Sequence, residues 1–338
     1  MTGDGWAAIA AAFAASGAVV VVLARLARRL PLDVPNDRSL HVRAVPRAGG
    51  YALWAGFLPV ALWFPPVPAA WGAAVWALPW LAVALVSAAD DARGVAARVR
   101  LVVHCAAAIG CAGALWHASR DAMPLFEPAG IATIMLLGLA IAWSANLFKF
   151  MDGRDGLAGA MALVGFGAYG VAAQAAGASG VAFFALAAAT LPFLAVNRPH
   201  ATMFLGDVGA VPLGFLAGAF GVAGILAGDW PAWFPPLVFL PFIADASVTL
   251  ARRLLRGAPL AVAHREHYYQ RLNQLGAGHA GTLAAYAAAM VASATTALAC
   301  LAFAPALGVI ALGGATVVCF ILFAAIDRQW RTRSLASR

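Results

Sequence analysis

Long apolar runs, separated by short polar segments, fill the sequence from one end to the other. The runs are 17 to 23 residues long, which is the length that an α-helix needs to cross the hydrocarbon core of a membrane. They predict transmembrane helices at residues 6–26, 50–66, 69–89, 99–117, 129–148, 157–175, 180–196, 208–227, 234–254, 281–303 and 306–326. We therefore expect an all-α polytopic membrane helical bundle with about 10–11 transmembrane helices.

The composition agrees with a membrane protein. Hydrophobic residues make up 63% of the 338 residues and charged residues only 11%, whereas a soluble domain carries about 25% charged residues. No soluble domain, low-complexity tract or clear repeat interrupts the runs, so residues 1–338 are expected to form one integral-membrane domain. Since no basic segment precedes the run near Trp6, this run is expected to be a membrane helix rather than a cleavable signal peptide.

The distribution of basic residues predicts an orientation. If the N-terminus is placed outside and the loops are counted alternately, 21 of the 22 Lys and Arg residues fall inside, and only Arg120 falls outside. Cytoplasmic loops carry such an excess of basic residues. We expect a periplasmic N-terminus and a cytoplasmic C-terminus, and we attribute the net charge of +8 to topology rather than to nucleic-acid binding.

Five polar segments fall on the inside, and each begins or ends a predicted helix. They are PNDRSLHVRAVPRAGG (35–50), SAADDARG (87–94), KFMDGRDGLAG (149–159), NRPHATMFLGDVGA (197–210) and RGAPLAVAHREHYYQRLNQLG (256–276). No predicted outer loop has comparable content. The pattern indicates one composite cytoplasmic site.

Aspartates are the most informative residues of these segments. They are Asp90 and Asp91, Asp152 and Asp155, and Asp207. Carboxylate oxygens suit Mg²⁺ or Mn²⁺, and a metal beside phosphate is the usual arrangement for phosphoryl transfer. One aspartate alone is well explained as a helix N-cap, but five at one membrane face indicate a functional site. If residues 152–155 form a helical turn, Asp152 and Asp155 face the same side.

The segment HREHYYQR adds donors for phosphate or sugar oxygens. His264, His267 and Arg271 are spaced i, i+3 and i+7, so on a helix they would share one face. A surface helix that touches lipid headgroups is the alternative. In the first segment, Arg38 and His41 suit an anionic headgroup or a substrate phosphate, although basic residues there also fit simple topology.

Asp245 lies deeper, within the run predicted at 234–254. Two alternatives stay open for its carboxylate. It serves the site, or it pairs with Arg252 or Arg253.

The five segments, in this order from about Pro35 to Gly276, resemble the polyprenyl-phosphate N-acetylhexosamine-1-phosphate transferases. This is the superfamily (glycosyl transferase family 4) that includes MraY and WecA. The matching motifs are PN.R..H..P.P..GG at 35–50, the Asp90–Asp91 pair, N..N..DG.DGLA at 146–158 and F.GD.GS at 204–210. MraY-like enzymes carry a run of histidines in the last loop. Here HREHYYQRL is similar to the bacterial branch that initiates O-antigen and related surface polysaccharides.

The resemblance implies a reaction and a location. A UDP-N-acetylhexosamine would donate its sugar 1-phosphate to undecaprenyl phosphate, with release of UMP and a need for Mg²⁺ (or Mn²⁺). The protein would lie in the bacterial inner membrane with its active site facing the cytoplasm. Its partners would be the two substrates, the lipid bilayer and, as in similar proteins, a second copy in a homodimer, with no nucleic acid.

The resemblance also implies roles for particular residues. The catalytic residues would be Asp90, Asp91, Asp207, His264 and His267. The metal ligands would be Asp207, Asp152 and Asp155. Substrate would be bound by Asn36, Arg38, His41, Asn146, Lys149, Asp152, Asp155, Arg265 and Arg271. Asp90 would orient or deprotonate the lipid phosphate, with Asp91 helping nearby.

Three positions depart from the pattern and several alternatives remain open. Lys149 replaces the second asparagine of N..N..DG, Ala210 replaces the serine of GD.GS, and Arg154 lies where similar proteins carry a small or apolar residue. A phospho-N-acetylmuramoyl-pentapeptide transferase of the same superfamily and an ion-coupled transporter are the rival functions. Direct attack and a two-step route through an aspartyl phosphate on Asp90 both fit. The sequence does not identify the sugar or the groove for the prenyl chain.

Overall fold

The computed structural model describes residues 1–34, 44–120, 128–153, 155–259 and 264–336. Within these ranges the protein is almost entirely helical. The helices are α1 (Gly3–Arg25), α2 (Gly49–Trp63), α3 (Ala74–Arg93), α4 (Ala97–Ala118), α5 (Pro128–Met151), α6 (Leu157–Ala175), α7 (Val181–Asn197), α8 (Asp207–Ala227), α9 (Phe234–Val238), α10 (Leu240–Leu255), α11 (Tyr268–Leu272), α12 (Gly278–Phe303) and α13 (Gly308–Ala336). Short helical turns are η1 (Ala27–Arg29), η2 (Ala69–Trp71), η3 (Asn273–Ala277) and η4 (Pro305–Leu307). Two short strands, β1 (Leu32–Asp33) and β2 (Val45–Pro46), pair antiparallel.

Ten of the eleven apolar runs predicted from the sequence each overlap largely with one α-helix, and the eleventh is helical in two parts, so the predicted all-α polytopic membrane bundle is confirmed. Eight helices in the described ranges are long and apolar enough to cross a membrane. α2 and α7 are shorter, with 15 and 17 residues. The run predicted at 234–254 is divided into α9 and α10, because Pro241 has no N–H to donate to the carbonyl of Leu237 in a continuous helix.

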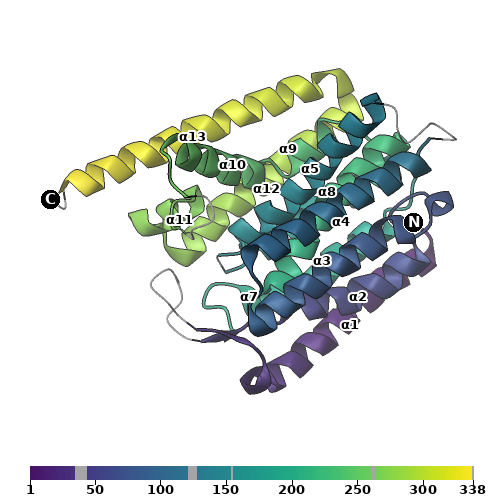
Figure 1. Cartoon of the computed structure of the whole chain (residues 1–338), viewed down its shortest axis with the longest axis horizontal. Helices are drawn as coiled ribbons and strands as arrows, with labels where there is room; N and C mark the ends of the chain where they lie inside the picture. Colours follow the sequence, from purple (N-terminus) through teal and green to yellow (C-terminus); the bar gives the residue numbers. More distant parts are fainter. Residues whose placement is uncertain (35–43, 121–127, 154, 260–263, 337–338) are drawn as a thin grey trace.

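The core of the bundle is built around α8. Of its apolar stretch, 78% is buried, against 6% for α13, which lies along the edge of the bundle opposite α1 (Figure 1). Small residues allow the close approach: a Cβ at Gly218 would lie 2.9 Å from the Cα of Ile141 on α5. Packing of this kind is typical of membrane helices, where shape rather than water drives association.

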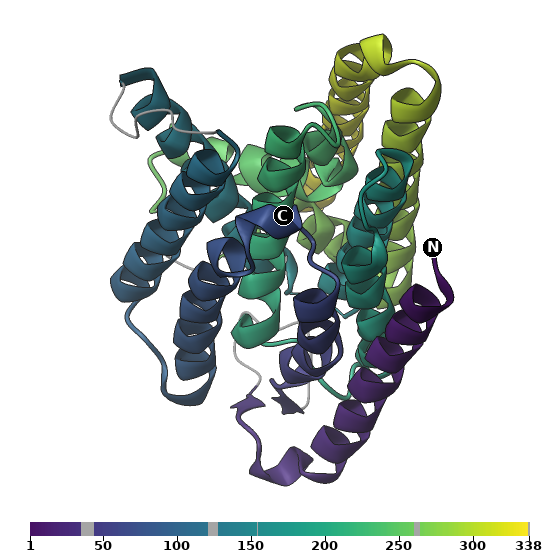
Figure 2. The same cartoon turned by 90° about the vertical axis from the view of Figure 1, so that its right-hand side faces the viewer.

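The alternating directions of the helices bring several polar segments to one end of the bundle (Figures 1 and 2). α3 and α5 end where α8 begins, so the side chains of Asp91 and Lys149 reach the start of α8. The N-terminus of α2 packs directly on that of α8, where Gly50 meets Gly209 with no room for a side chain. The fold therefore gathers polar residues from the segments at 87–94, 149–159 and 197–210.

Candidate active site

Asp91 ties the end of α3 to the start of α8. Its Oδ1 accepts the main-chain N–H of Asp207 at 3.1 Å, and its Oδ2 accepts that of Val208 at 2.8 Å. The first turn of a helix leaves its N–H groups without helical partners, so this carboxylate acts as a cap supplied by another helix. Gly206 allows the arrangement, since it has φ +76° and an added Cβ would lie 2.8 Å from Asp91 Oδ2. Asp91 thereby fixes the backbone that carries Asp207.

Removal of this cap has a measurable consequence. Asp91→Ala is expected to destabilise the protein by about 1 kcal/mol, the usual contribution of an N-cap, and to lower its thermal unfolding midpoint in detergent. Asp4→Ala is the matched control, because Asp4 is an exposed residue in the first turn of α1. Equal midpoints for the Asp91→Ala variant and the wild type would contradict the capping role.

Two carboxylates and two cations form a cluster beside this cap. Lys149 pairs with Asp207 and lies with its Nζ 3.5 Å from Asp90 Oδ2. Arg100 pairs with Asp90 and lies with its guanidinium 3.6 Å from Asp207 Oδ2. We call these four residues together with Asp91, which caps α8 beside them, the carboxylate cluster (Asp90, Asp91, Arg100, Lys149 and Asp207). The side chains of the four that form ion pairs are 10% to 26% exposed, so ligands from solution can reach them.

Sequence reasoning did not single out Arg100. It is one of the 21 basic residues that the predicted orientation places inside. The available signal was its position in the first turn of α4, where the short connection from α3 brings it back to Asp90.

Asp152 and Asp155 do not share a helix face. α5 ends at Met151 and α6 begins at Leu157, and the described residues between them are not helical, so the condition for the predicted shared face is not met. Gly156, with φ +77°, provides the change of direction. The two carboxylates therefore have different surroundings.

Asp152 is half-buried next to the carboxylate cluster, and Asp155 is buried elsewhere. Burial by the surrounding protein, and after it the negative charges of Asp207 and Asp91, raise the pKa of Asp152 well above its usual range. Asp155 Oδ2 accepts the main-chain N–H of His200 at 3.0 Å and lies 3.1 Å from Nδ1 of His279. Asp155 thus links the segment before α8 to the start of α12.

The metal predicted from the sequence can be compared with these donors. Among the residues that the structure describes, no three His, Cys, Asp or Glu side chains are arranged to hold a metal ion. The described side chains thus do not provide a three-ligand metal site on their own. Mg²⁺ is commonly held by one or two carboxylates together with substrate phosphates, and the oxygens of Asp207 and the neighbouring Asp90 fit that kind of binding.

The other predicted substrate-binding residues lie at several places. Asn36, Arg38 and His41 lie outside the described residues. Asn146 is half-buried on α5, where its amide donates to the carbonyl of Ala142 at 2.8 Å, one turn before Lys149. Arg265 is half-buried between the two histidines of the last loop.

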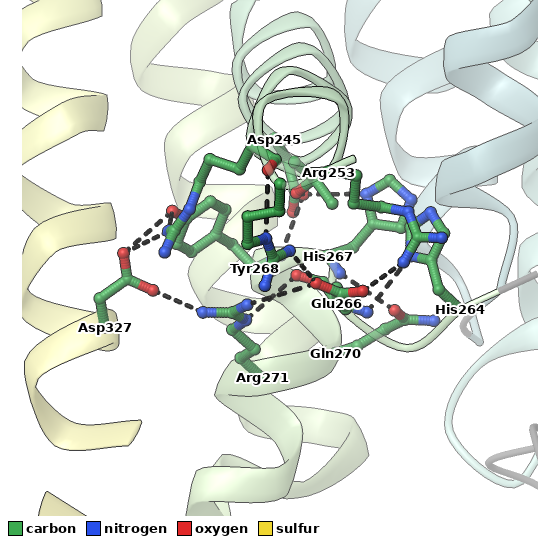
Figure 3. Close-up of polar contacts among 12 residues, drawn as sticks. Asp245, Arg253, His264, Glu266, His267, Tyr268, Gln270, Arg271 and Asp327 are labelled. Carbon is green, nitrogen blue, oxygen red and sulfur yellow. Dashed lines mark hydrogen bonds and ion pairs between the residues drawn. The ribbon is translucent and has the colours of Figure 1, made fainter. Parts of the chain in front are cut away.

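Residues 264–272, here called the histidine loop, carry the polar contacts drawn in Figure 3. His264, His267 and Arg271 do not lie on one helix, because α11 begins only at Tyr268. The two histidines nonetheless meet, with ring centroids 5.0 Å apart. Burial, then His267 and Arg253, lower the pKa of His264 to about 4, so this ring is neutral at pH 7.

Arg271 points away from the histidines, toward α13 (Figure 3). Its Nη1 donates to Asp327 Oδ1 at 2.6 Å and its Nε donates to the carbonyl of Glu266 at 3.1 Å. Asp327 also pairs with Arg252. The predicted substrate-binding role of Arg271 remains a prediction, and in the structure this guanidinium joins α13 to the histidine loop.

The histidine loop is docked on the end of α5. The ring of His267 stacks on Phe150 with centroids 5.9 Å apart, and the hydroxyl of Tyr269 donates to the carbonyl of Phe150 at 3.2 Å. Phe150 follows Lys149 of the carboxylate cluster. The loop and the cluster therefore share one segment of α5 and form one composite region.

Comparison with known proteins identifies the family of this region. The sequence model of glycosyl transferase family 4 matches residues 73–225, which contain the whole carboxylate cluster. The central part of the chain is therefore similar to glycosyl transferase family 4. The superfamily resemblance predicted from the motifs is thereby confirmed.

Several curated proteins are similar to half or more of the chain. The probable undecaprenyl-phosphate N-acetylglucosaminyl 1-phosphate transferase of Bacillus subtilis is 23% identical, over 80% of this chain and 79% of its own length. The undecaprenyl-phosphate alpha-N-acetylglucosaminyl 1-phosphate transferase of Yersinia pestis is 27% identical, over 96% of this chain and 92% of its own. A phospho-N-acetylmuramoyl-pentapeptide-transferase of Picosynechococcus is 31% identical, but over 52% of this chain and 48% of its own.

Proposed function

We propose that this protein transfers an N-acetylhexosamine 1-phosphate from a UDP-sugar to undecaprenyl phosphate and releases UMP. The observation that carries the proposal is the carboxylate cluster. Its aspartates and cations come from four helices, α3, α4, α5 and α8, and converge at one end of a membrane bundle. The named activities of the family-4 relatives support it. The reaction would initiate a surface polysaccharide such as O-antigen, on the cytoplasmic face of the bacterial inner membrane.

The residues of the cluster suit both phosphate groups of this reaction. Arg100 and Lys149 are partly exposed cations that can neutralise phosphate oxygens. Asp90 would orient the acceptor phosphate, which needs little deprotonation because its second pKa is about 6. An oxygen of this phosphate attacks the β-phosphorus of the donor. The new P–O bond forms as the bond from the β-phosphorus to the bridging oxygen breaks, and UMP leaves with that oxygen.

The metal would be held by Asp207 and the neighbouring Asp90 together with the donor diphosphate, with Asp152 as a further carboxylate close enough to feel the charge of Asp207. When bound, Mg²⁺ supplies neutralisation of the charge that develops on the diphosphate. Asp155 was predicted to join this set. Its contacts with His200 and His279 instead suit a role in shaping the segment that precedes Asp207.

The phospho-N-acetylmuramoyl-pentapeptide transferase remains the second candidate within the family. It is favoured by the 31% identity of the Picosynechococcus relative. That similarity covers 52% of this chain, whereas the similarity to the Yersinia pestis enzyme covers 96%. The wider coverage favours a UDP-N-acetylhexosamine as the donor.

The proposed reaction is tested by release of UMP from the purified protein in detergent. The assay contains undecaprenyl phosphate, Mg²⁺, and either one of a panel of UDP-N-acetylhexosamines or the muramoyl-pentapeptide nucleotide. We expect UMP from an N-acetylhexosamine donor, and none when the lipid or the metal is omitted. Release only from the pentapeptide nucleotide would establish the second candidate. No release from any donor, beside an active family-4 control enzyme, would refute the proposal.

A further inference from the structure

Asp245 on α10 is a fully buried carboxylate that the proposed reaction does not use (Figure 3). Its Oδ1 accepts the main-chain N–H of Tyr268 at 3.0 Å and lies 3.2 Å from Nδ1 of His267. Its Oδ2 accepts the main-chain N–H of Tyr269 at 2.9 Å and the hydroxyl of Tyr286. A buried charge is costly unless it is paired and hydrogen-bonded, so this set of partners explains its stability there.

Neither arginine that follows on α10 serves Asp245. Arg252 pairs with Asp327, and Arg253 pairs with Glu266. Of the two alternatives that the sequence left open, the arginine pairing is therefore absent. Instead, the carboxylate of Asp245 accepts hydrogen bonds from the histidine loop, from the hydroxyl of Tyr286 and from the hydroxyl of Thr249 on its own helix.

The contact with His267 has a chemical consequence. A carboxylate oxygen can only accept, so Nδ1 of His267 must carry the proton at this contact. In the neutral ring Nε2 then carries the lone pair. The ring cannot turn easily, because it stacks on Phe150 on one side and on His264 and Tyr269 elsewhere.

We propose that Asp245 is a positioning residue of the candidate site, which fixes the ring of His267 with its proton on Nδ1 and holds the histidine loop against the end of α5. A simple helix cap would need only the N–H groups of Tyr268 and Tyr269. The additional contact, from Asp245 to Nδ1 of His267, selects one tautomer of the imidazole ring, and this ring packs on Phe150, the residue after Lys149. The orientation of the ring stands independently of the reaction, whereas its effect on catalysis rests on the proposed function.

The first test measures the ring itself and needs no activity. ¹⁵N spectra of the protein labelled with [¹⁵N]histidine report which nitrogen carries the proton, and His267→Gln identifies the signal of His267. We expect protonation at Nδ1 in the wild type and a mixture of tautomers in Asp245→Asn. Tyr286→Phe is the matched control, because it removes a partner of Oδ2 and leaves the Oδ1 contact, so its His267 signal is expected to stay unchanged. A wild-type ring protonated only at Nε2 would overturn the proposal, even if the Asp245→Asn variant did not fold.

The second test asks whether Asp245 acts through His267. Asp245→Asn is expected to lower kcat for UMP release by roughly tenfold, through misplacement of the ring. Asp245→Asn in a His267→Gln background is expected to lower kcat no further, because residues that act together are not additive. Independent, multiplying losses would overturn the proposed coupling. If the wild type releases no UMP, the proposed function fails, and the ¹⁵N spectra alone decide the role of Asp245.

Discussion

Asp207→Asn is expected to lower kcat for UMP release by about a thousand-fold, the size of effect seen when a group that stabilises transition-state charge is removed. Asparagine keeps the shape of the side chain but loses the charge that pairs with Lys149 and faces Arg100. Asp91 caps the main-chain N–H of residue 207 and not its side chain, so the start of α8 is expected to stay intact. The measurement is kcat at saturating donor, with Mg²⁺ varied, beside the thermal unfolding midpoint.

Asp229→Asn provides the matched control for this prediction. Asp229 is a half-buried aspartate just beyond the other end of α8, and the 21 residues of that helix separate the two positions by about 30 Å. The same chemical change there is expected to leave kcat within about twofold of wild type, since distant sites act independently. An Asp207→Asn variant with more than a tenth of wild-type activity, or an equal loss in Asp229→Asn, would contradict the proposed role.

The sequence was sufficient to predict the membrane helices, because the length and the apolar character of a run are local properties of the chain. Each predicted run is helical in the structure, although the run at 234–254 is divided into α9 and α10 at Pro241. The grouping of Asp90 and Asp207 was also predictable, because alternating helices must return polar ends to the same membrane face.

The partners of these residues were not predictable, because they depend on how the helices pack. Asp91 has both oxygens on the N-terminus of α8, which lies 116 residues further along the chain. Asp327 joins Arg271 from α13, a helix that the motif resemblance did not reach. The spacing of His264 and His267 suits a helix, but both lie before α11, because Asp245 caps the chain only at Tyr268 and Tyr269.

Asp152 and Asp155 show how two similar aspartates are stabilised differently at a membrane surface. Asp155 is satisfied within the protein by the N–H of His200 and by His279. Burial, and after it the negative charges of Asp207 and Asp91, raise the pKa of Asp152. A bound cation would therefore stabilise the charged form of Asp152 more than that of Asp155. For this reason we place Asp152 nearer to the proposed metal.

Lys149→Met is expected to lower kcat/KM by about a hundred-fold, the second large effect. The ammonium lies between Asp207 and Asp90, and methionine of similar length leaves these carboxylates with Arg100 alone to offset their charges. The donor diphosphate also loses a cation that can reach it. Lys149→Arg keeps the charge and is expected to retain most of the activity.

Lys149 is the only lysine in the sequence, so its charge can also be changed chemically. Acetylation of amines removes the charge of Lys149, whereas reductive methylation keeps it. We expect acetylation to abolish UMP release, methylation to leave most of it, and UDP-sugar with Mg²⁺ to protect against acetylation. The Lys149→Arg variant, whose remaining reactive amine is the N-terminus, is expected to resist acetylation. Inactivation of that variant, or full activity of the acetylated wild type, would show that the ammonium between Asp90 and Asp207 does not serve the reaction.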